Sequence, residues 1–254
     1  MNTFKLPNSL MMRPIKIALV GAGGTGSALL TELFQMDYLL RNISQNSVYL
    51  DIAVFDDDEV SHSNVGRQSF WACDIGNNKA ETLVNRFNVH GGLSWTAHRE
   101  RVSKAHVDQL AKFDVLITCV DKAAVRAELG SAFNQVKRFA ETLWLDMGND
   151  KNSGQVVLGH AFDRENKLPN VFDLYPSLSE MVDKDEDSCS HEAALQKQEF
   201  GINKKVALEA STLLWKLLRH GEIKHHGAFI NMDETSVHPL KIDTQTWAMF
   251  GYQS

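Results

Sequence analysis

Apolar residues in the first 150 positions alternate between short continuous runs and stretches at helical spacing. Runs typical of buried or half-buried strands occur at residues 15–20, 48–55, 94–102, 113–119 and 143–147. Helical spacing follows the glycine-rich stretch at 21–26 and recurs at residues 79–87 and 123–139. This alternation predicts an α/β fold: a twisted, mostly parallel sheet with helices on both faces.

The pattern changes after about residue 150. Strands are predicted at 154–161 and 227–232, and one long helix is predicted from Asn203, a suitable N-cap, to the Gly221 stop. An acidic loop at 183–187 lies between them. We expect further strands and helices in this C-terminal third to extend the first sheet, so that residues 1–254 form a single domain.

Composition narrows the possible partners and compartment. The 26 Lys and Arg against 32 Asp and Glu give a net charge of −6, and no dense basic block marks a nucleic-acid or anionic-membrane surface. No apolar run reaches the ~18 residues of a membrane span, and residues 1–12 lack the apolar core of a signal peptide. We therefore expect a cytoplasmic protein that binds neither nucleic acid nor membrane.

Three cysteines fit a reducing compartment, and the lack of a C-x-x-C pair predicts no structural zinc. Cys73 and Cys119 lie among apolar residues and are predicted to be inert core thiols. Cys189 has small polar neighbours, which favour exposure and a lowered pKa, although the acidic run before it acts in the opposite direction.

The residues Gly21, Gly23 and Gly26 match G-x-G-x-x-G between a predicted strand and a predicted helix. Such a loop lets the backbone approach a phosphate at a helix N-terminus, and the alternative is a tight turn without a ligand. Asp56, at the end of the second strand, is the expected ribose ligand. It comes later than the usual spacing of about 20 residues because the connection at 37–46 is predicted to be long.

Two cations, Arg67 and Lys79, follow the acidic stretch Asp56–Glu59. A dinucleotide needs little beyond backbone N–H groups, whereas a triphosphate favours fixed cations on its outer phosphates. The alternative is a pair of solvated surface cations that neutralise the acidic stretch. Beside the glycine loop, the pattern favours a nucleoside triphosphate.

Four motifs in order resemble the ThiF/MoeB/HesA superfamily, which includes the ubiquitin-activating enzymes. They are G-x-G-G-x-G at 21–26, D-x-D-x-V-x-x-S-N-x-x-R-Q at 56–68, G-x-x-K at 76–79 and C-x-D at 119–121. The resemblance covers roughly residues 15–160, and the sequence looks most similar to members encoded in the ParB-related, ThiF-related cassette. It implies a Rossmann-like sheet, with a nucleotide-binding half at 15–150 and a carrier-protein-facing half at 151–254.

The resemblance implies adenylylation, with ATP and Mg²⁺, of the C-terminal carboxylate of a small ubiquitin-like or sulfur-carrier protein. Arg67 and Lys79 would act on the phosphates, and Asp121 would hold Mg²⁺ unless it serves only as the N-cap of the following helix. Cys189 would accept the activated carboxyl group, the alternative being an ordinary loop cysteine. The remaining ATP-binding residues implied are Gly21, Gly23, Gly24, Gly26, Asp56, Asp58, Asn64 and Gln68.

Two departures from the resemblance and two rival functions stay open. Many relatives have two C-x-x-C pairs, and many supply an arginine in trans from an N-terminal helix, whereas Arg13 alone precedes the first strand here. The homodimer therefore stays open.

His220, His225 and His226 fit a solvated turn better than a metal site. The rivals are an NAD(P)-dependent oxidoreductase and a nucleotide-binding adaptor without catalysis.

Overall fold

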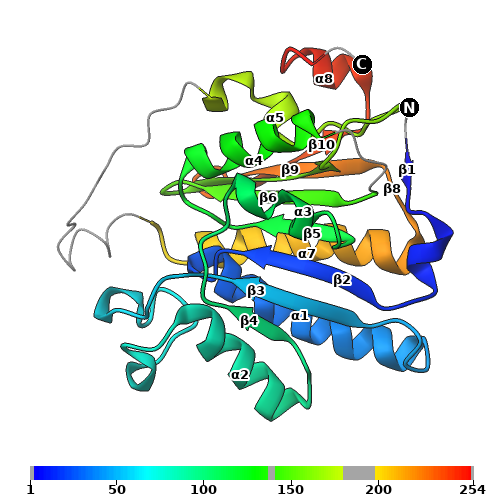
Figure 1. Cartoon of the computed structure of the whole chain (residues 1–254). Coiled ribbons are helices and arrows are strands. Elements are labelled where there is room, and N and C mark those ends of the chain that lie inside the picture. Colours follow the sequence, from blue (N-terminus) through cyan, green and yellow to red (C-terminus); the bar gives the residue numbers. More distant parts are fainter. Residues whose placement is uncertain (1–2, 137–140, 180–197, 253–254) are drawn as a thin grey trace.

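A computed structural model describes the chain except for residues 1–2, 137–140, 180–197 and 253–254 (Figure 1). Its main sheet has eight strands in the order β10-β9-β7-β6-β5-β2-β3-β4. These strands are β2 (Ile15–Val20), β3 (Leu50–Phe55), β4 (Thr96–His98), β5 (Val115–Thr118), β6 (Leu143–Asn149), β7 (Ser153–His160), β9 (His225–Asn231) and β10 (Ser236–Lys241). A separate pair joins β1 (Phe4–Lys5) to β8 (Glu222–Ile223).

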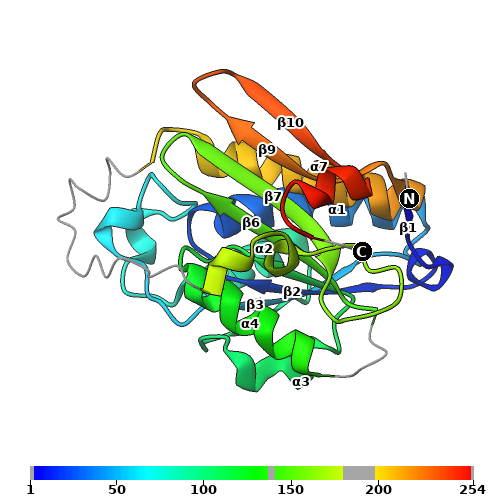
Figure 2. The same cartoon turned by 90° about the horizontal axis from the view of Figure 1, so that it is seen from above.

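Strands β4, β3, β2, β5 and β6 are parallel, and β7, β9 and β10 add to them antiparallel. The α-helices are α1 (Gly24–Ile43), α2 (Lys79–Gly91), α3 (Val107–Leu110), α4 (Ala123–Gln135), α5 (Val171–Leu174), α7 (Ile202–His220) and α8 (Thr244–Ala248). Short 3-10 helices are η1 (Asn8–Met11), η2 (His62–Asn64), η3 (Ala72–Asp74), η4 (Lys104–His106) and η5 (Pro176–Ser179). Helices α1 and α7 pack side by side on one face, and α4 covers the other (Figures 1 and 2). The predicted α/β fold, with helices on both faces and an extended C-terminal part, is confirmed.

Helix α1 corrects the explanation for the late position of Asp56. Residues 37–43 continue the helix, so the long connection predicted at 37–46 is wrong. Asp37 is buried within this helix. Its carboxylate is satisfied there by a hydrogen bond from the Leu50 amide and an ion pair with Arg41 at 2.6 Å. A longer helix, rather than a longer loop, separates the glycine loop from β3.

The N-cap of α7 is Gly201, which has a φ of +95°, so the helix begins two residues earlier than the predicted cap at Asn203 implies. Asn203, the predicted cap, lies buried inside the first turn. The strand β10 and the pair formed by β1 and β8 were not predicted from the sequence pattern. β1 and β8 have only two residues each, and β10 carries polar residues such as Ser236 and His238, so neither gives a clear alternating signal.

The order of the strands opens a crevice between β2 and β5. The chain leaves β2 for α1 on one face and leaves β5 for α4 on the other, so the two connections diverge at the carboxyl ends of neighbouring strands. Open α/β sheets bind ligands at such a switch point. Arg13 lies at the opposite end of β2, where it pairs with Asp114 at 2.6 Å, and so stands away from this crevice.

No helix within the described parts of the chain is long and apolar enough to span a bilayer.

Candidate functional site

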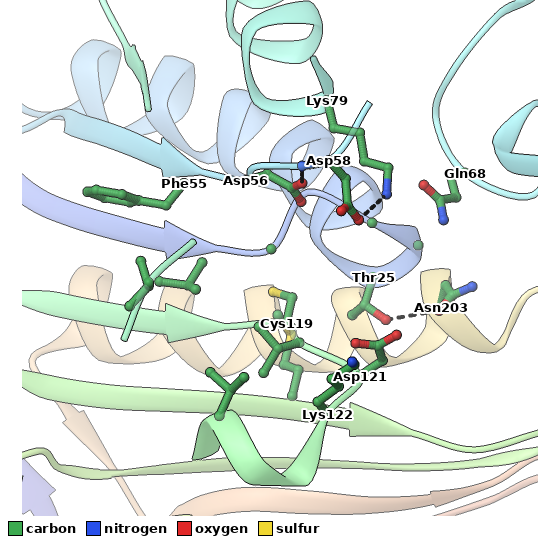
Figure 3. A pocket seen from close by; sticks show the side chains of 18 of the residues that line it. Thr25, Phe55, Asp56, Asp58, Gln68, Lys79, Cys119, Asp121, Lys122 and Asn203 are labelled. Carbon is green, nitrogen blue, oxygen red and sulfur yellow. Dashed lines mark hydrogen bonds and ion pairs between the residues drawn. The ribbon is translucent and has the colours of Figure 1, made fainter. Parts of the chain in front are cut away.

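A pocket of about 610 Å³ occupies the carboxyl ends of β2, β3 and β5 (Figure 3). This volume lies in the range of small-molecule sites, roughly 300–1,000 Å³. Nearly all of the predicted site residues that the structure describes line it: Gly21, Gly23, Gly24, Asp56, Asp58, Asn64, Arg67, Gln68, Lys79 and Asp121. The tertiary structure thus brings together motifs that are separated by up to 100 positions.

The glycines of the loop serve different purposes. Gly21 has a φ of +93°, which favours glycine, and its amide donates to the Phe55 carbonyl at the end of β3. Gly26 does not line the pocket. A Cβ there would lie 1.9 Å from the Gly21 carbonyl oxygen, so only glycine fits at this position. It is the glycine that lets α1 pack closely under the loop.

Asp56 anchors the glycine loop. Its carboxylate accepts hydrogen bonds from the Ala22 amide at 2.6 Å and from the Asp58 amide at 2.9 Å. Burial raises the pKa of Asp56, against the lowering effect of these bonds and of Lys79. A ribose ligand at this position would therefore meet a carboxylate that already holds the loop in place.

Lys79 opens α2 and points into the pocket, where its amine pairs with Asp58 at 2.8 Å (Figure 3). The Asp58 side chain is 57% exposed, whereas that of Lys79 is only 10% exposed. Asn78, which sequence reasoning missed, caps α2 and donates to the carbonyls of Asp56 and Asp58. This amide holds the acidic turn beside the lysine.

Arg67, Asn64 and Gln68 come from the segment around η2. The Asn64 Oδ1 accepts from the Ser61 amide, so the buried Asn64 also shapes its own turn. Within the described part of the chain, no carboxylate lies within 4 Å of the Arg67 guanidinium, which makes a long hydrogen bond of 3.4 Å to Gln198. Arg67 is therefore available to an anionic ligand.

Gln68 carries a buried acceptor that fits a bound ligand. Its amide points into the pocket (Figure 3), and its Oε1 is the single buried side-chain oxygen or nitrogen in the described residues without a hydrogen-bond partner. Buried polar atoms of this kind are normally satisfied by a protein group, a water or a ligand. A ligand hydroxyl or amine would satisfy it.

Asp121 lies exposed on the opposite wall, with its carboxylate facing the pocket (Figure 3). The capping alternative for Asp121 is wrong, because the N-cap of α4 is Lys122. The Asp121 carboxylate is thus not the N-cap of α4. Lys122 also lines the pocket and was not predicted.

A buried network holds the loop that carries Asp121. Arg126 pairs with Asp146 at 2.8 Å and donates to the Val120 carbonyl at 2.6 Å, while Thr118 donates to Asp146 at 2.5 Å. The Asp146 side chain is completely buried. Sequence reasoning missed this pair, although an aspartate inside the apolar run 143–147 is the signal that indicates a buried polar partner.

The two cysteines that the structure describes behave differently. Burial, and secondarily the charge of Asp146, raises the pKa of the Cys119 thiol well above its ordinary value, which fits the predicted inert thiol. The prediction for Cys73 is wrong: this residue is exposed, because η3 lies at the surface and only Phe70 of its apolar neighbours is buried. Cys189 lies outside the described residues.

Helix α7 closes the pocket from the C-terminal half. The Asn203 side chain accepts from the Thr25 hydroxyl at 2.9 Å and donates to Gln198 at 2.9 Å. A Cβ at Gly24 would lie 2.7 Å from Asn203, so the second glycine of the G-G pair leaves room for this side chain. Sequence reasoning missed Thr25, Gln198 and Asn203 as neighbours because they meet only in three dimensions.

Carboxylates, rather than histidines, are the candidate metal ligands. Within the described ranges, only Asp56, Asp57 and Asp58 bring three potential ligand atoms within 4.8 Å of one another. The prediction of a solvated histidine turn is wrong for His226, which is buried in β9 and is hydrogen-bonded to the Leu158 carbonyl and the Trp247 Nε1. Both ring nitrogens of His226 are therefore engaged by protein groups.

A protein-family model for the ThiF family matches residues 1–246. The chain belongs to the ThiF family. This confirms the resemblance at the level of the family, and the specific relation to the ParB-related, ThiF-related cassette stays a prediction. The roles of individual pocket residues in this ThiF-family chain also stay predictions.

Solved structures share the fold at low identity. A structure of PaaA matches with a TM-score of 0.64 at 14% identity, over 91% of this chain and 65% of that one. E. coli MccB with ATP matches with a TM-score of 0.60 at 14% identity, over 91% and 65%. MccB in complex with N-formylated MccA matches with a TM-score of 0.61 at 15% identity, over 91% and 66%. This chain therefore spans about two thirds of the length of these proteins.

Proposed function

We propose that this ThiF-family chain uses ATP to adenylylate the C-terminal carboxylate of a peptide or small protein. The observation that carries the proposal is one pocket in which Arg67 and Lys79 stand beside the glycine loop and Asp121 faces them. MccB, which shares the fold, has been crystallised with ATP and with its partner MccA. Those complexes support a protein of this fold that binds both a nucleotide and a polypeptide.

The residues suit attack of a carboxylate on the α-phosphorus. That reaction increases negative charge on the phosphate oxygens and on the departing pyrophosphate, so fixed cations and an orienting pocket supply the catalysis. Arg67, which lacks a carboxylate partner among the described residues, can bind those oxygens directly. Lys79 can exchange its exposed partner Asp58 for phosphate.

Mg²⁺ fits the pocket through its carboxylates. Asp121 and the exposed Asp58 offer oxygen ligands, which a hard divalent cation prefers, on two sides of the glycine loop. When bound, Mg²⁺ would neutralise charge on the phosphates. The backbone amides of the loop and the unpartnered Gln68 Oε1 would orient the nucleotide.

The finer identity of the substrate follows from the resemblance. We infer a ubiquitin-like or sulfur-carrier protein with an exposed C-terminal tail, a transfer of the activated carboxyl group to Cys189, and a cytoplasmic location. The position of Arg13, away from the pocket, gives no support to an arginine supplied from its segment in trans. The homodimer stays an open part of the proposal.

The test is ATP/pyrophosphate exchange by the full chain with candidate small proteins that end in Gly-Gly. We expect exchange with one of them, and a loss of about 10²–10³-fold in Arg67→Ala or Lys79→Ala. The matched control is Arg99→Ala, because Arg99 is exposed, pairs with Glu81 and does not line the pocket. Exchange that survives Cys189→Ala would place the thiol after adenylylation or outside the chemistry.

Two outcomes would favour the rival functions. Mg·ATP at 100 times its dissociation constant should stabilise the fold by about 2.7 kcal/mol. Stabilisation by NAD(H) and not by ATP would overturn the proposal in favour of an oxidoreductase. ATP binding without exchange for any candidate would support the adaptor.

A further inference from the structure

A second cavity lies directly against the nucleotide pocket, and the two share Arg67, Gln198 and Asn203 in their linings. These three side chains form a partition. It is held by hydrogen bonds from Asn203 to Gln198 at 2.9 Å and from Arg67 to Gln198 at 3.4 Å. A group bound on the far side of this partition therefore lies next to the residues proposed to bind the phosphates.

Among the residues that the structure describes, the lining of the second cavity is positively charged. Its lining includes Arg67, Lys151 and Lys204 against one carboxylate, Glu199, whose nearest approach to Lys151 is a long 3.8 Å. The whole chain carries a net charge of −6, so this concentration of cations is a local departure from its average. An anionic ligand is the complementary partner.

Helix α7 adds to the positive potential. Lys204 and Lys205 lie in its first turn, which has no acidic residue. Because the N-terminus of a helix carries a partial positive charge, lysines there are unfavourable for the isolated helix and acidic residues are preferred. Of the two lysines, Lys204 lines the cavity, so its cost to the helix is offset there by attraction for an anion.

Phe200 indicates a polypeptide ligand rather than a free inorganic anion. Its side chain lines the cavity and is 88% exposed, and the Lys204 amine lies 5.7 Å from its ring centroid. An exposed aromatic ring beside cations offers both apolar contact and ion pairing. A peptide segment with acidic side chains can use both, whereas pyrophosphate can use only the charges.

We propose that this cavity binds an acidic segment of the polypeptide substrate next to its C-terminal carboxylate, and that Lys151 and Lys204 select such tails. The inference rests on the proposed function, because it assigns the substrate class for the same reaction. The carboxylate would pass the partition at Gln198 and Asn203, while the acidic residues upstream remain in the cavity. Since each extended residue spans ~3.3–3.6 Å, the selected positions are the few that precede the terminus.

Direct binding tests this without requiring catalysis. Fluorescein-labelled Gly-Asp-Glu-Asp-Gly-Gly and Gly-Asn-Gln-Asn-Gly-Gly would be titrated with the full chain, with and without Mg·ATP, and followed by fluorescence anisotropy. We expect the acidic peptide to bind about tenfold more tightly at low salt, and the difference to shrink as salt screens the charges. The double variant Lys151→Glu/Lys204→Glu should abolish or reverse the preference.

Lys205→Glu is the matched control, because it makes the same charge change in the same helical turn but lies outside the cavity lining. It should retain most of the preference for the acidic peptide. Thermal unfolding of each variant checks that the fold persists. Equal binding of both peptides, or an equal effect of Lys205→Glu and Lys204→Glu, would overturn the inference.

The exchange assay separates this inference from the proposed function. Acidic-peptide preference together with exchange, and a raised KM for the acidic substrate at unchanged kcat in Lys151→Ala, supports both. Preference without exchange supports the binding cavity and contradicts adenylylation. Exchange without any preference for the acidic peptide would contradict the cavity as a tail-selecting site and would still support adenylylation. Equal displacement of both peptides by pyrophosphate would have the same meaning for the cavity.

Discussion

On one wall of the nucleotide pocket Lys79 pairs with Asp58, and on the opposite side Arg126 pairs with Asp146, each at 2.8 Å. The distances are equal, but the burial differs. Asp58 is 57% exposed at the pocket surface, whereas Asp146 has no exposed side-chain area and also accepts a hydrogen bond from Thr118. One ion pair lines the pocket, and the other lies inside the protein and holds the loop at Val120.

The difference shows why residue type alone does not assign a role. An ion pair whose carboxylate is exposed is partly screened by water and contributes little to stability, so its cation can exchange partners when an anion binds. In a buried pair each charge depends on the other, because neither can return to water without unfolding. Lys79 is therefore suited to ligand binding, and Arg126 to positioning the loop that carries Asp121 through its bond to the Val120 carbonyl.

The largest expected effect is on the buried side of this comparison. Asp146→Ala leaves the Arg126 guanidinium buried without its partner, so the free energy of unfolding should fall by about 3–5 kcal/mol. Urea denaturation followed by tryptophan fluorescence measures it. The double variant Arg126→Met/Asp146→Leu should recover most of the loss. A loss below about 1 kcal/mol for Asp146→Ala would mean that the two pairs are equivalent.

A smaller loss in the free energy of unfolding is expected at acid pH. It comes from two buried histidines in β7 and β9, the strands that continue the sheet beyond β6. Burial lowers the pKa of His160 to about 3 and that of His226 to about 4. Because the unfolded chain binds a proton near pH 6.5, the stability from neutral histidine is complete above that pH and is lost as pH falls. For each histidine, the free energy of unfolding should fall by about 2 kcal/mol between pH 8 and pH 5.

The measurement is urea denaturation of the wild type and His226→Gln at both pH values. Glutamine retains a hydrogen-bonding side chain but does not titrate in this range, so the variant should lose about 2 kcal/mol less than the wild type between pH 8 and pH 5. An identical pH dependence in the two proteins would exclude His226 as a source of acid sensitivity.

The smallest effect on stability is expected at the exposed pair. Lys79→Ala should change the free energy of unfolding by less than about 1 kcal/mol, because its partner Asp58 is 57% exposed and stays hydrated without the lysine. Lys79→Ala should nevertheless lose much of the thermal stabilisation by Mg·ATP. Thermal shift with and without Mg·ATP measures both quantities. A cost near that of Asp146→Ala would remove the distinction between the two walls.

Local signals predicted the elements that build the pocket. The apolar run at 15–20 and the glycine loop placed a strand, a tight turn and a helix, and the structure places Gly21 and Asp56 where the motif requires them. The apolar run and the glycine loop can be recognised in the sequence because each depends only on residues that are close together along the chain. Arg67 and Lys79 were found because their motifs lie close behind the second strand.

Long-range contacts could not be read in the same way. Asn203 looked like a helix cap, and only the packing of α7 against α1 places it on Gly24 and Thr25. Cys73 looked buried because of its apolar neighbours, but η3 turns that segment outward. Residue type and local spacing carry no direct information about which distant segments become neighbours.

The sequence by itself determined the ThiF family, the order of the main strands and helices in the front half, and the charged and glycine residues of the motifs that line the pocket. The tertiary structure alone decided which charges are buried, which side chains divide the two cavities, and which wall holds the Arg126 network. The physical reason is that hydrogen-bonding geometry and periodicity are local, whereas burial and electrostatic partnership depend on how distant segments pack.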